Sequence, residues 1–215
     1  MVHNLSKQHS IFNNFLAEIR DEVVQRDSLR FRRNMERIAE IMGYELSKHL
    51  KYSSKDIATS LGVAQVFTVD SEIVLATILR AGLPMHQGLL NYFDKADSAF
   101  VSAYRKHTSG DDFDVFVEYC AAPTIDGKVL IISDPMLATG SSMLLVYKAL
   151  LKNGNPKQIH IVSAIATNEA LALIKKHFPE NTNVWVGAID EELTVQAYIV
   201  PGLGDAGDLA FGDKL

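Results

Sequence analysis

Apolar residues follow two different spacings along the chain, and the spacing changes after the first two predicted elements. Residues 10–26 and the stretch that follows Ser28 carry apolar side chains every three or four positions, which is typical of amphipathic helices. Ser28 is a suitable N-cap for the second of these helices. Residues 51–61 are polar and follow neither spacing, so we expect a loop or a short turn there.

Short apolar runs bounded by turn residues dominate the rest of the chain and predict strands. The predicted strands are residues 63–69, 72–79, 99–104, 115–119, 129–132, 156–166 and 183–189. The predicted helices are residues 83–93, 143–151 and 168–177, the last with Asn168 as its N-cap. From Glu72 onward the order is therefore β-α-β-β-β-α-β-α-β. This order favours an α/β fold with a mostly parallel central sheet and helices on both faces.

Length and composition predict a single domain. The 215 residues, 47% apolar and 22% charged, suffice for one soluble domain with a substantial core. We expect residues 1–215 to form it, with residues 1–62 as an N-terminal helical extension. No apolar run is long enough to span a bilayer, and the first residues lack the pattern of a signal peptide. With one cysteine, Cys120, an internal disulfide is excluded, so the expected compartment is the cytoplasm, without a membrane partner.

The charge of the chain limits the classes of partner. A net charge of −5 argues against broad nucleic-acid binding, which needs a basic surface. Four arginines nevertheless cluster on the second predicted helix: Arg30, Arg32, Arg33 and Arg37. This cluster could bind an anion or an effector, or it could be a solvated face or a subunit contact.

The first candidate binding motif is a strand, an acidic residue, a loop of small residues and a helix. Asp134 stands at the end of the predicted strand 129–132, and residues 135–142 form the loop before the next helix. Free backbone N–H groups at the positive end of a helix dipole suit a phosphate group, and Gly140 lets the backbone approach it closely. The loop is not a nucleotide-triphosphatase P-loop, because no Gly-Lys-Ser/Thr follows it. The alternative is an ordinary strand-to-helix turn with a Ser/Thr cap.

Two other segments carry candidate chemistry. Arg80, Ala81 and Gly82 form a second short turn between a strand and a helix, where open α/β sheets bind ligands, although Arg80 could also be structural. The polar residues 105–112 lie between two predicted strands and could form a mobile lid. The C-terminal residues 197–212 contain four glycines and a proline, and their pattern alone predicts an irregular loop.

Three stretches of the chain resemble motifs of the uracil phosphoribosyltransferases, within the type I phosphoribosyltransferase family. DPMLATGSS resembles the loop that binds phosphoribosyl diphosphate (PRPP), ILRAGLPM resembles the diphosphate-binding turn, and AYIVPGLGDAGDLAFG resembles the C-terminal segment that covers the base. The resemblance implies the reaction of uracil with PRPP to give UMP and diphosphate, in pyrimidine salvage. It also implies a type I phosphoribosyltransferase-like fold in which residues 190–215 form a hood over the base.

The resemblance assigns roles to individual residues. Asp134, Arg80 and Arg105 would take part in catalysis. The residues expected to bind PRPP are Arg80, Ala81, Gly82, Arg105, Asp134, Pro135, Met136, Leu137, Ala138, Thr139, Gly140, Ser141, Ser142 and Asp205. The residues expected to bind uracil are Ile199, Gly204, Asp205 and Ala206, mainly through backbone groups. The chain departs from the family pattern at Ser141, Pro84 and Leu209, where a glycine, a glycine and a basic residue are usual.

The resemblance also implies a cofactor and partners. Mg²⁺ would arrive with PRPP, with no residue of the chain assigned as a dedicated metal ligand. GTP is a possible effector, since it activates some relatives, and a homodimer or a higher homo-oligomer is expected. Two alternatives remain at this point: a regulatory RNA-binding protein on the same fold, and a catalytically weakened paralogue that senses nucleotides.

Overall fold

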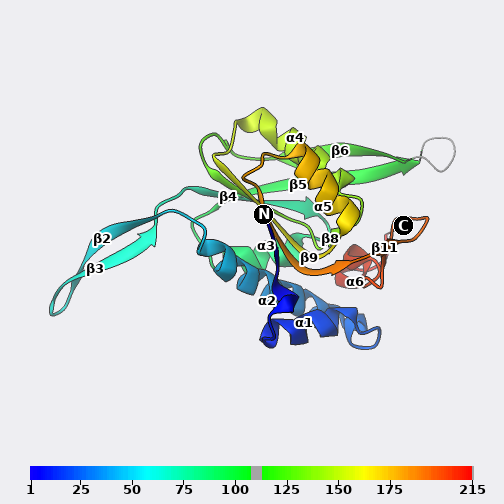
Figure 1. Ribbon diagram of the computed structural model, residues 1–215, viewed down its shortest axis with the longest axis horizontal. Coiled ribbons are helices and arrows are strands. Elements are labelled where there is room, and N and C mark those ends of the chain that lie inside the picture. Colours follow the sequence, from blue (N-terminus) through cyan, green and yellow to red (C-terminus); the bar gives the residue numbers. More distant parts are fainter. Residues whose placement is uncertain (108–112, 215) are drawn as a thin grey trace.

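A mixed, mostly parallel sheet forms the centre of the computed structural model, which describes residues 1–107 and 113–214 (Figure 1). Its order is β1–β10–β9–β7–β4–β5–β6, with β8 paired to β9, and only the β5–β6 pair is antiparallel. The strands are β1 (Val2–Asn4), β4 (Ile73–Leu79), β5 (Asp97–His107), β6 (Phe113–Ala121), β7 (Val129–Ser133), β8 (Met136–Leu137), β9 (Gln158–Thr167) and β10 (Asn183–Asp190). The predicted α/β class is confirmed.

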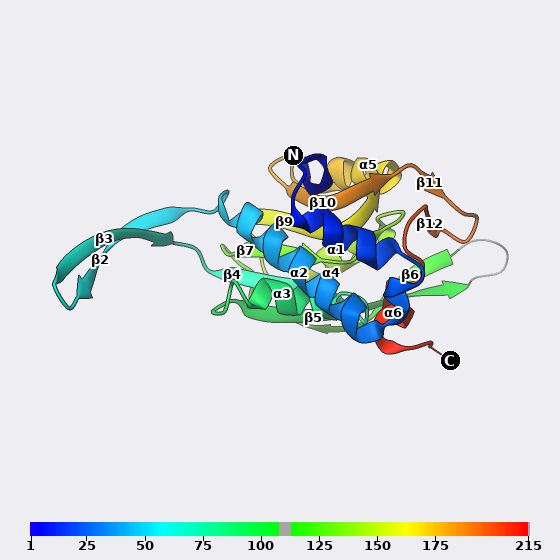
Figure 2. The ribbon, with the colours of Figure 1, turned by 90° about the horizontal axis from the view of Figure 1, so that it is seen from below.

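Helices cover both faces of this sheet (Figures 1 and 2). One core contains side chains of α1 (Ile11–Arg20), α2 (Ser28–Ser47), α3 (Leu83–Leu90) and α6 (Ala206–Phe211). The other core contains side chains of α4 (Ser141–Leu150) and α5 (Asn168–His177). Short 3-10 helices, η1 (Leu5–Lys7), η2 (Val24–Arg26) and η3 (Leu151–Asn153), occupy connections. The element order predicted from Glu72 onward is found as far as β10, with the short β8 added. Two short strands, β11 (Glu192–Leu193) and β12 (Ile199–Val200), and helix α6 follow β10 and were not predicted.

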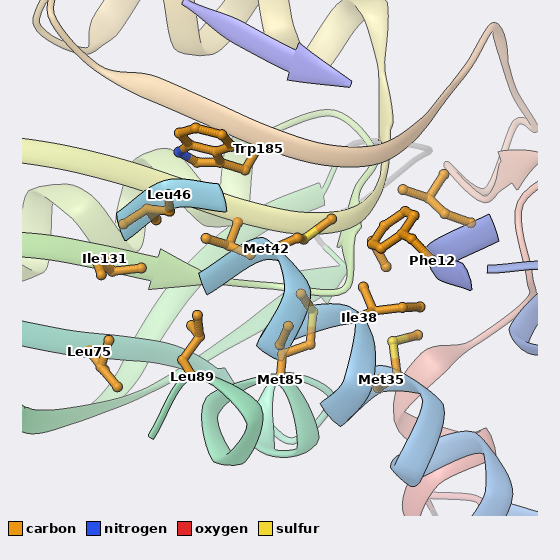
Figure 3. Packing of buried hydrophobic residues seen from close by; sticks show 14 of the residues in the cluster. Phe12, Met35, Ile38, Met42, Leu46, Leu75, Met85, Leu89, Ile131 and Trp185 are labelled. Atoms are coloured by element: carbon orange, nitrogen blue, oxygen red, sulfur yellow. The ribbon is translucent and has the colours of Figure 1, made fainter. Parts of the chain in front are cut away.

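Helix α2 supplies the centre of the larger core (Figure 3). Its residues Met35, Ile38, Met42 and Leu46 recur at helical spacing and are fully buried against the sheet and α3. Each such side chain contributes roughly 1.5–3 kcal/mol when it leaves water. The amphipathic pattern therefore determines which side of α2 faces the sheet. No helix within residues 1–107 and 113–214 combines the length and apolar character needed to cross a membrane.

The structure corrects the prediction for residues 51–61. They are not a loop, because β2 (Tyr52–Thr59) pairs antiparallel with β3 (Gly62–Val69) in a two-stranded hairpin. This hairpin projects away from the rest of the protein (Figures 1 and 2). Strand β3 matches the strand predicted at residues 63–69, whereas β2 was missed. Because the hairpin is largely exposed in the protomer, the polar β2 lacks the apolar alternation of a half-buried strand. The helical part of residues 1–62 accordingly ends at Ser47.

Other differences from the prediction concern element ends. Helix α1 stops at Arg20 and is followed by η2, so residues 10–26 are not one helix. Asp27, and not Ser28, caps α2, because the Asp27 carboxylate accepts hydrogen bonds from two backbone N–H groups. Thr167 takes the place predicted for Asn168 at the start of α5. Both residues of the pair Asp27 and Ser28, and both of the pair Thr167 and Asn168, are suitable N-cap types, so the local sequence does not decide which of them caps the helix.

A buried histidine gives the core a pH-dependent stability. His160 on β9 is fully buried, and its Nδ1 accepts a hydrogen bond of 3.1 Å from the indole nitrogen of Trp185. Burial, and then the nearby His49 and His3, lowers the pKa of His160 from 6.5 to about 4. The unfolded chain protonates His160 more readily than the folded protein does. The contribution of this residue to stability is therefore fully present above pH 6.5 and is lost as the pH drops from 6.5 towards 4. The loss at the acidic end should be about 3 kcal/mol.

Replacing His160 by glutamine should flatten this dependence between pH 6.5 and 4. A glutamine oxygen can accept the indole hydrogen bond and does not titrate. Denaturant unfolding at a series of pH values measures the slope, with the exposed His177→Gln as the control that keeps it. His86, whose pKa burial also lowers, adds to the slope in every variant. An unchanged slope in His160→Gln would refute the assignment.

Candidate active site

Two of the predicted binding turns lie at one edge of the sheet. Strands β4 and β7 are parallel neighbours, and Thr77 pairs with Ser133. Arg80 follows the last residue of β4, and Asp134 follows the last residue of β7. Topology therefore brings the Arg80 turn and the Asp134 loop together at the carboxyl ends of adjacent strands, where open α/β sheets bind ligands.

The loop after Asp134 surrounds a small hollow in front of α4. The hollow is lined by Asp134, Met136, Leu137, Ala138, Thr139, Gly140, Ser142 and Met143. Gly140 has a φ of +80°, and a Cβ there would lie 3.1–3.3 Å from atoms of Leu173 and Ala170 on α5. Glycine is therefore required twice at this position, for its conformation and for the packing of the loop on α5.

Ser141 fits this loop without distorting it. It is the first residue of α4, so its backbone is helical and a side chain is tolerated. Its hydroxyl oxygen accepts a hydrogen bond of 3.1 Å from Thr139, and its N–H lies 3.4 Å from the same Thr139 oxygen. The departure from the usual glycine is thus absorbed by a hydrogen bond within the loop.

The Arg80 turn is held by close packing at Gly82, the N-cap residue of α3. A Cβ at Gly82 would overlap the hydroxyl oxygen of Thr77 and lie 2.8 Å from the carbonyl oxygen of Ile78. The peptide bond between Leu79 and Arg80 is cis. Pro84 lies in the first turn of α3, where the missing N–H costs no helical hydrogen bond, so this departure from the family pattern suits the helix start.

A buried ion pair anchors the C-terminal segment to the body of the protein. Both terminal nitrogens of Arg20 donate to the Asp190 carboxylate at 2.8 Å, and Asp190 accepts a further hydrogen bond of 2.9 Å from the backbone N–H of Gly202. Arg20 also donates to the carbonyl oxygen of Gly202 at 3.1 Å. Gly202, with a φ of +56°, follows a cis peptide bond between Val200 and Pro201. The path of this segment is therefore determined at its first turn.

Beyond this anchor, the residues predicted to bind uracil lie on one continuous stretch. β11 (Glu192–Leu193) pairs antiparallel with β12 (Ile199–Val200), and α6 follows. Ile199 and Ala206 are buried, whereas Gly204 is exposed with a φ of +91°. The prediction of an irregular loop is wrong for residues 199–200, which form β12, and for residues 206–211, which form α6. Side chains outside that segment, such as Arg32 donating to the carbonyl oxygen of Ala210 at 2.6 Å, hold this short helix in place.

Asp205 is the N-cap of α6 and is fixed by several donors. One carboxylate oxygen accepts from the N–H groups of Gly207 and Asp208 at 2.9 and 3.0 Å, and the other accepts from Lys214 at 2.9 Å. Burial by itself raises the pKa of Asp205, but the bond from Lys214 and the two backbone bonds outweigh it, so the pKa lies below its ordinary value. Leu209, in place of the family's basic residue, packs against the apolar core.

Helix α6 also touches the Arg80 turn. Arg80 Nη2 donates to Asp208 Oδ1 at 2.9 Å, and a Cβ placed on Gly207 would lie 3.8 Å from that of Ala81. Three predicted segments, the loop after Asp134, the Arg80 turn and the C-terminal segment, therefore meet at one end of the sheet (Figures 1 and 2).

Not every predicted residue can be placed. Arg105 lies on β5 with its backbone opposite Val115, but its side chain and the predicted lid tip at residues 108–112 fall outside the described part of the structure. Sequence analysis did not single out Arg20, Asp190, Asp208 or Lys214. Of these four, Asp190 alone has a position that could have indicated a role, because it is an acidic residue at the end of a predicted strand, as Asp134 is.

The arginines of α2 have partners within the protein. Each engages a neighbouring group of the protein. The partners are Glu18 for Arg30, the Ala210 carbonyl oxygen for Arg32, Glu36 for Arg33 and Asn34 for Arg37. Only Arg30 and Arg33 are paired with carboxylates, because the partners of Arg32 and Arg37 are uncharged.

The described residues include no group of three or more His, Cys, Asp or Glu side chains arranged to hold a metal ion. The carboxylate of Asp134 lines the loop hollow and is a hard oxygen donor of the kind that Mg²⁺ prefers. This donor set fits an ion that brings most of its ligands with a phosphorylated substrate.

Comparisons with known proteins agree with this geometry. The uracil phosphoribosyltransferase family model matches residues 6–213. A uracil phosphoribosyltransferase from Porphyromonas gingivalis is 56% identical over 214 residues, which cover 100% of this chain and 99% of the relative. One from Thermococcus gammatolerans is 37% identical and covers 93% of this chain and 88% of the relative.

Among solved structures, an Aquifex aeolicus protein superposes with a TM-score of 0.88 at 29% identity, over 99% of this chain and 98% of the other. The match of the family model over nearly the whole chain, together with relatives at this level of identity, is decisive. The chain belongs to the uracil phosphoribosyltransferase family.

Proposed function

We propose that this protein transfers a phosphoribosyl group from PRPP to uracil and so forms UMP and diphosphate. The observation that carries the proposal is that the loop after Asp134, the Arg80 turn and the C-terminal segment meet at one edge of the sheet. Family membership and the names of the relatives support the same reaction. Neither favours the RNA-binding or nucleotide-sensing alternative.

The proposed binding mode places PRPP along the two turns at this edge. The backbone N–H groups at the start of α4, with the hydroxyls of Thr139, Ser141 and Ser142, bind the 5′-phosphate. The Asp134 carboxylate accepts hydrogen bonds from the ribose hydroxyls. Arg80 binds the diphosphate, with Ala81 and Gly82 leaving room for it, and Arg105 reaches PRPP from β5.

Uracil is recognised by backbone groups of the C-terminal segment, at Ile199, Gly204 and Ala206, with Asp205 next to the ribose. A rigid turn presents these groups without the entropy cost of ordering side chains. The breaking bond joins C1 of the ribose to the diphosphate, and the transition state resembles an oxocarbenium ion, as in other glycosyl transfers. Positioning of the base and neutralisation of the departing charge by the two arginines account for the catalysis. When bound, Mg²⁺ neutralises further charge on the diphosphate, and Asp134 is the described carboxylate that could contact it.

The proposal is tested by incubating the protein with PRPP, Mg²⁺ and labelled uracil and measuring UMP. Asp134→Asn should reduce kcat/KM for PRPP by about 10- to 100-fold, because a hydrogen bond to a charged group contributes roughly 1.5–3 kcal/mol. The melting temperature should be unchanged. Asp94→Asn, an exposed residue between α3 and β5, is the matched control and should behave as the wild type. Unchanged kinetics in Asp134→Asn would remove this residue from the site.

We further propose that the protein forms a homodimer or a larger homo-oligomer through the β2–β3 hairpin. An isolated two-stranded hairpin is marginally stable in water, and this one exposes several large apolar side chains. They are Tyr52, Ile57, Leu61, Val63, Val66 and Phe67. A second copy of the chain that covers the hairpin would bury this apolar surface, which a monomer rarely leaves open.

Phe67→Asp should shift the protein towards a smaller assembly, because the charge would have to be buried in the contact. Sedimentation velocity at a series of concentrations measures the shift. Val23→Asp places the same charge on an equally exposed apolar residue outside the hairpin and serves as the control. A wild-type protein that sediments as a monomer, or a Phe67→Asp variant that assembles like the wild type, would contradict the role of the hairpin.

The proposal also includes the domain organisation, an effector and the cellular compartment. Residues 1–215 act as one catalytic domain in which residues 190–215 cover the base. GTP acts as an effector, which is tested by measuring the UMP rate with and without GTP, and an unchanged rate would contradict it. The reaction takes place in the cytoplasm.

A further inference from the structure

Four charged side chains from distant parts of the sequence meet beside the Arg80 turn. Arg80 directly follows β4, Asp205 and Asp208 belong to the start of α6, and Lys214 lies close to the C-terminus. Arg80 Nη2 donates to Asp208 Oδ1 at 2.9 Å. Lys214 Nζ is 2.9 Å from Asp205 and 3.8 Å from Asp208, so Asp208 lies between two cations.

Asp208 is a well-supported partner for Arg80. Its helix is capped at the N-terminal end by Asp205 and tied at the other end by Arg32, which donates to the Ala210 carbonyl oxygen. The Asp208 side chain is 26% exposed, whereas that of Arg80 is 42% exposed. The carboxylate is therefore the more buried partner and lies on a helix that is held at both ends, whereas the Arg80 side chain is more exposed to solvent.

The ion pair leaves most of the guanidinium donors of Arg80 available. An arginine carries five N–H donors in a planar fork, and the bond to Asp208 uses one terminal nitrogen, Nη2. A guanidinium can therefore contact an anion through its other N–H groups while Asp208 holds one end. Fixing the plane in advance also reduces the side-chain entropy that would be lost when the anion binds.

We propose that Asp208 is a positioning residue for Arg80, which it orients for the diphosphate of PRPP. The inference rests on the proposed function. It links the two halves of the site, because the helix that carries Asp208 begins at Ala206, one of the residues assigned to uracil. A ligand that orders α6 should therefore also order Arg80.

A double-mutant cycle on PRPP binding tests this proposal, with calorimetry as the readout in addition to UMP kinetics. Asp208→Asn should weaken PRPP binding by about three- to tenfold, the effect expected of one partly exposed, charged hydrogen bond. If Asp208 acts through Arg80, the same substitution should have no effect in an Arg80→Ala background. In steady-state kinetics, KM for PRPP should rise more than kcat falls.

Two further variants separate positioning from a structural role. Asp208→Glu keeps the charge and should recover part of the affinity, and Asp70→Asn removes an exposed carboxylate that pairs with Lys51 and should bind PRPP as the wild type does. Equal losses from Asp208→Asn in both backgrounds, or wild-type affinity in Asp208→Asn, would overturn the proposal. A wild-type protein that binds PRPP but forms no UMP would overturn the proposed activity, and the binding cycle would still decide the role of Asp208. If the wild type binds no PRPP, both proposals fail.

Discussion

Replacing Asp190 by alanine is expected to lower the free energy of unfolding by about 3–5 kcal/mol, because it leaves the Arg20 guanidinium without its partner in a mostly buried position. Asp190 is 7% exposed, and its two oxygens accept three hydrogen bonds, two from Arg20 and one from the Gly202 backbone. The substitution removes all three at once. Urea unfolding of the variant and the wild type measures the difference.

Asp190→Ala should also weaken the binding of uracil, since the ion pair holds the turn at Gly202 in the C-terminal segment. KM for uracil should therefore rise more than KM for PRPP. Glu45→Ala removes one partner of the exposed Lys48–Glu45 pair and should change stability by no more than about 0.5 kcal/mol. If the free energy of unfolding of Asp190→Ala lies within about 1 kcal/mol of the wild-type value, well short of the expected loss, the anchoring role is wrong.

Replacing Gly82 by alanine should reduce kcat/KM for PRPP by about 100-fold, because a displacement of roughly 1 Å in a positioned group costs that much. The φ of Gly82 is −73°, so alanine is allowed by backbone conformation and the effect is steric. Its Cβ would overlap Thr77 Oγ1 and lie 2.8 Å from the Ile78 carbonyl oxygen. Neither atom can withdraw easily, since Thr77 is fully buried and Ile78 is in the central strand β4. Overpacking of this kind should also cost about 1–3 kcal/mol of stability.

A second substitution identifies the source of this effect. Thr77→Ala removes the overlapping hydroxyl, so the double variant with Gly82→Ala should recover part of the stability and activity, while the contact with Ile78 persists. Gly43→Ala on α2 is the matched control, because the nearest atom to its Cβ would be the flexible end of Leu89, at 3.3 Å, and the next, in Phe93, lies at an ordinary contact distance of 3.5 Å. A Gly82→Ala protein with wild-type kinetics would show that the turn can move freely.

The elements around the sheet could be predicted because their partners impose a repeat on the local sequence. The continuous apolar run at β7 indicates a strand that is buried on both faces, and the helical spacing of Met35, Ile38 and Met42 indicates which side of α2 faces the core. Strand β3 was predicted from its apolar residues, but its partner β2 shows no such repeat, since it is almost entirely exposed in the protomer. Helix α6 was also missed, because it is short and contacts from Arg32 and Asp205 hold it in place.

The local amino-acid pattern was sufficient to predict the α/β class, the order of the longer elements from Glu72 to Asp190 and the motifs that surround the site. How those motifs are held together depends on tertiary contacts that no local pattern indicates. Arg20 and Asp190 are 170 positions apart, and Arg80 and Asp208 are 128 positions apart. Periodicity and spacing report on neighbours along the chain, whereas these ion pairs depend on which strands lie side by side and on which side chains lose contact with water there.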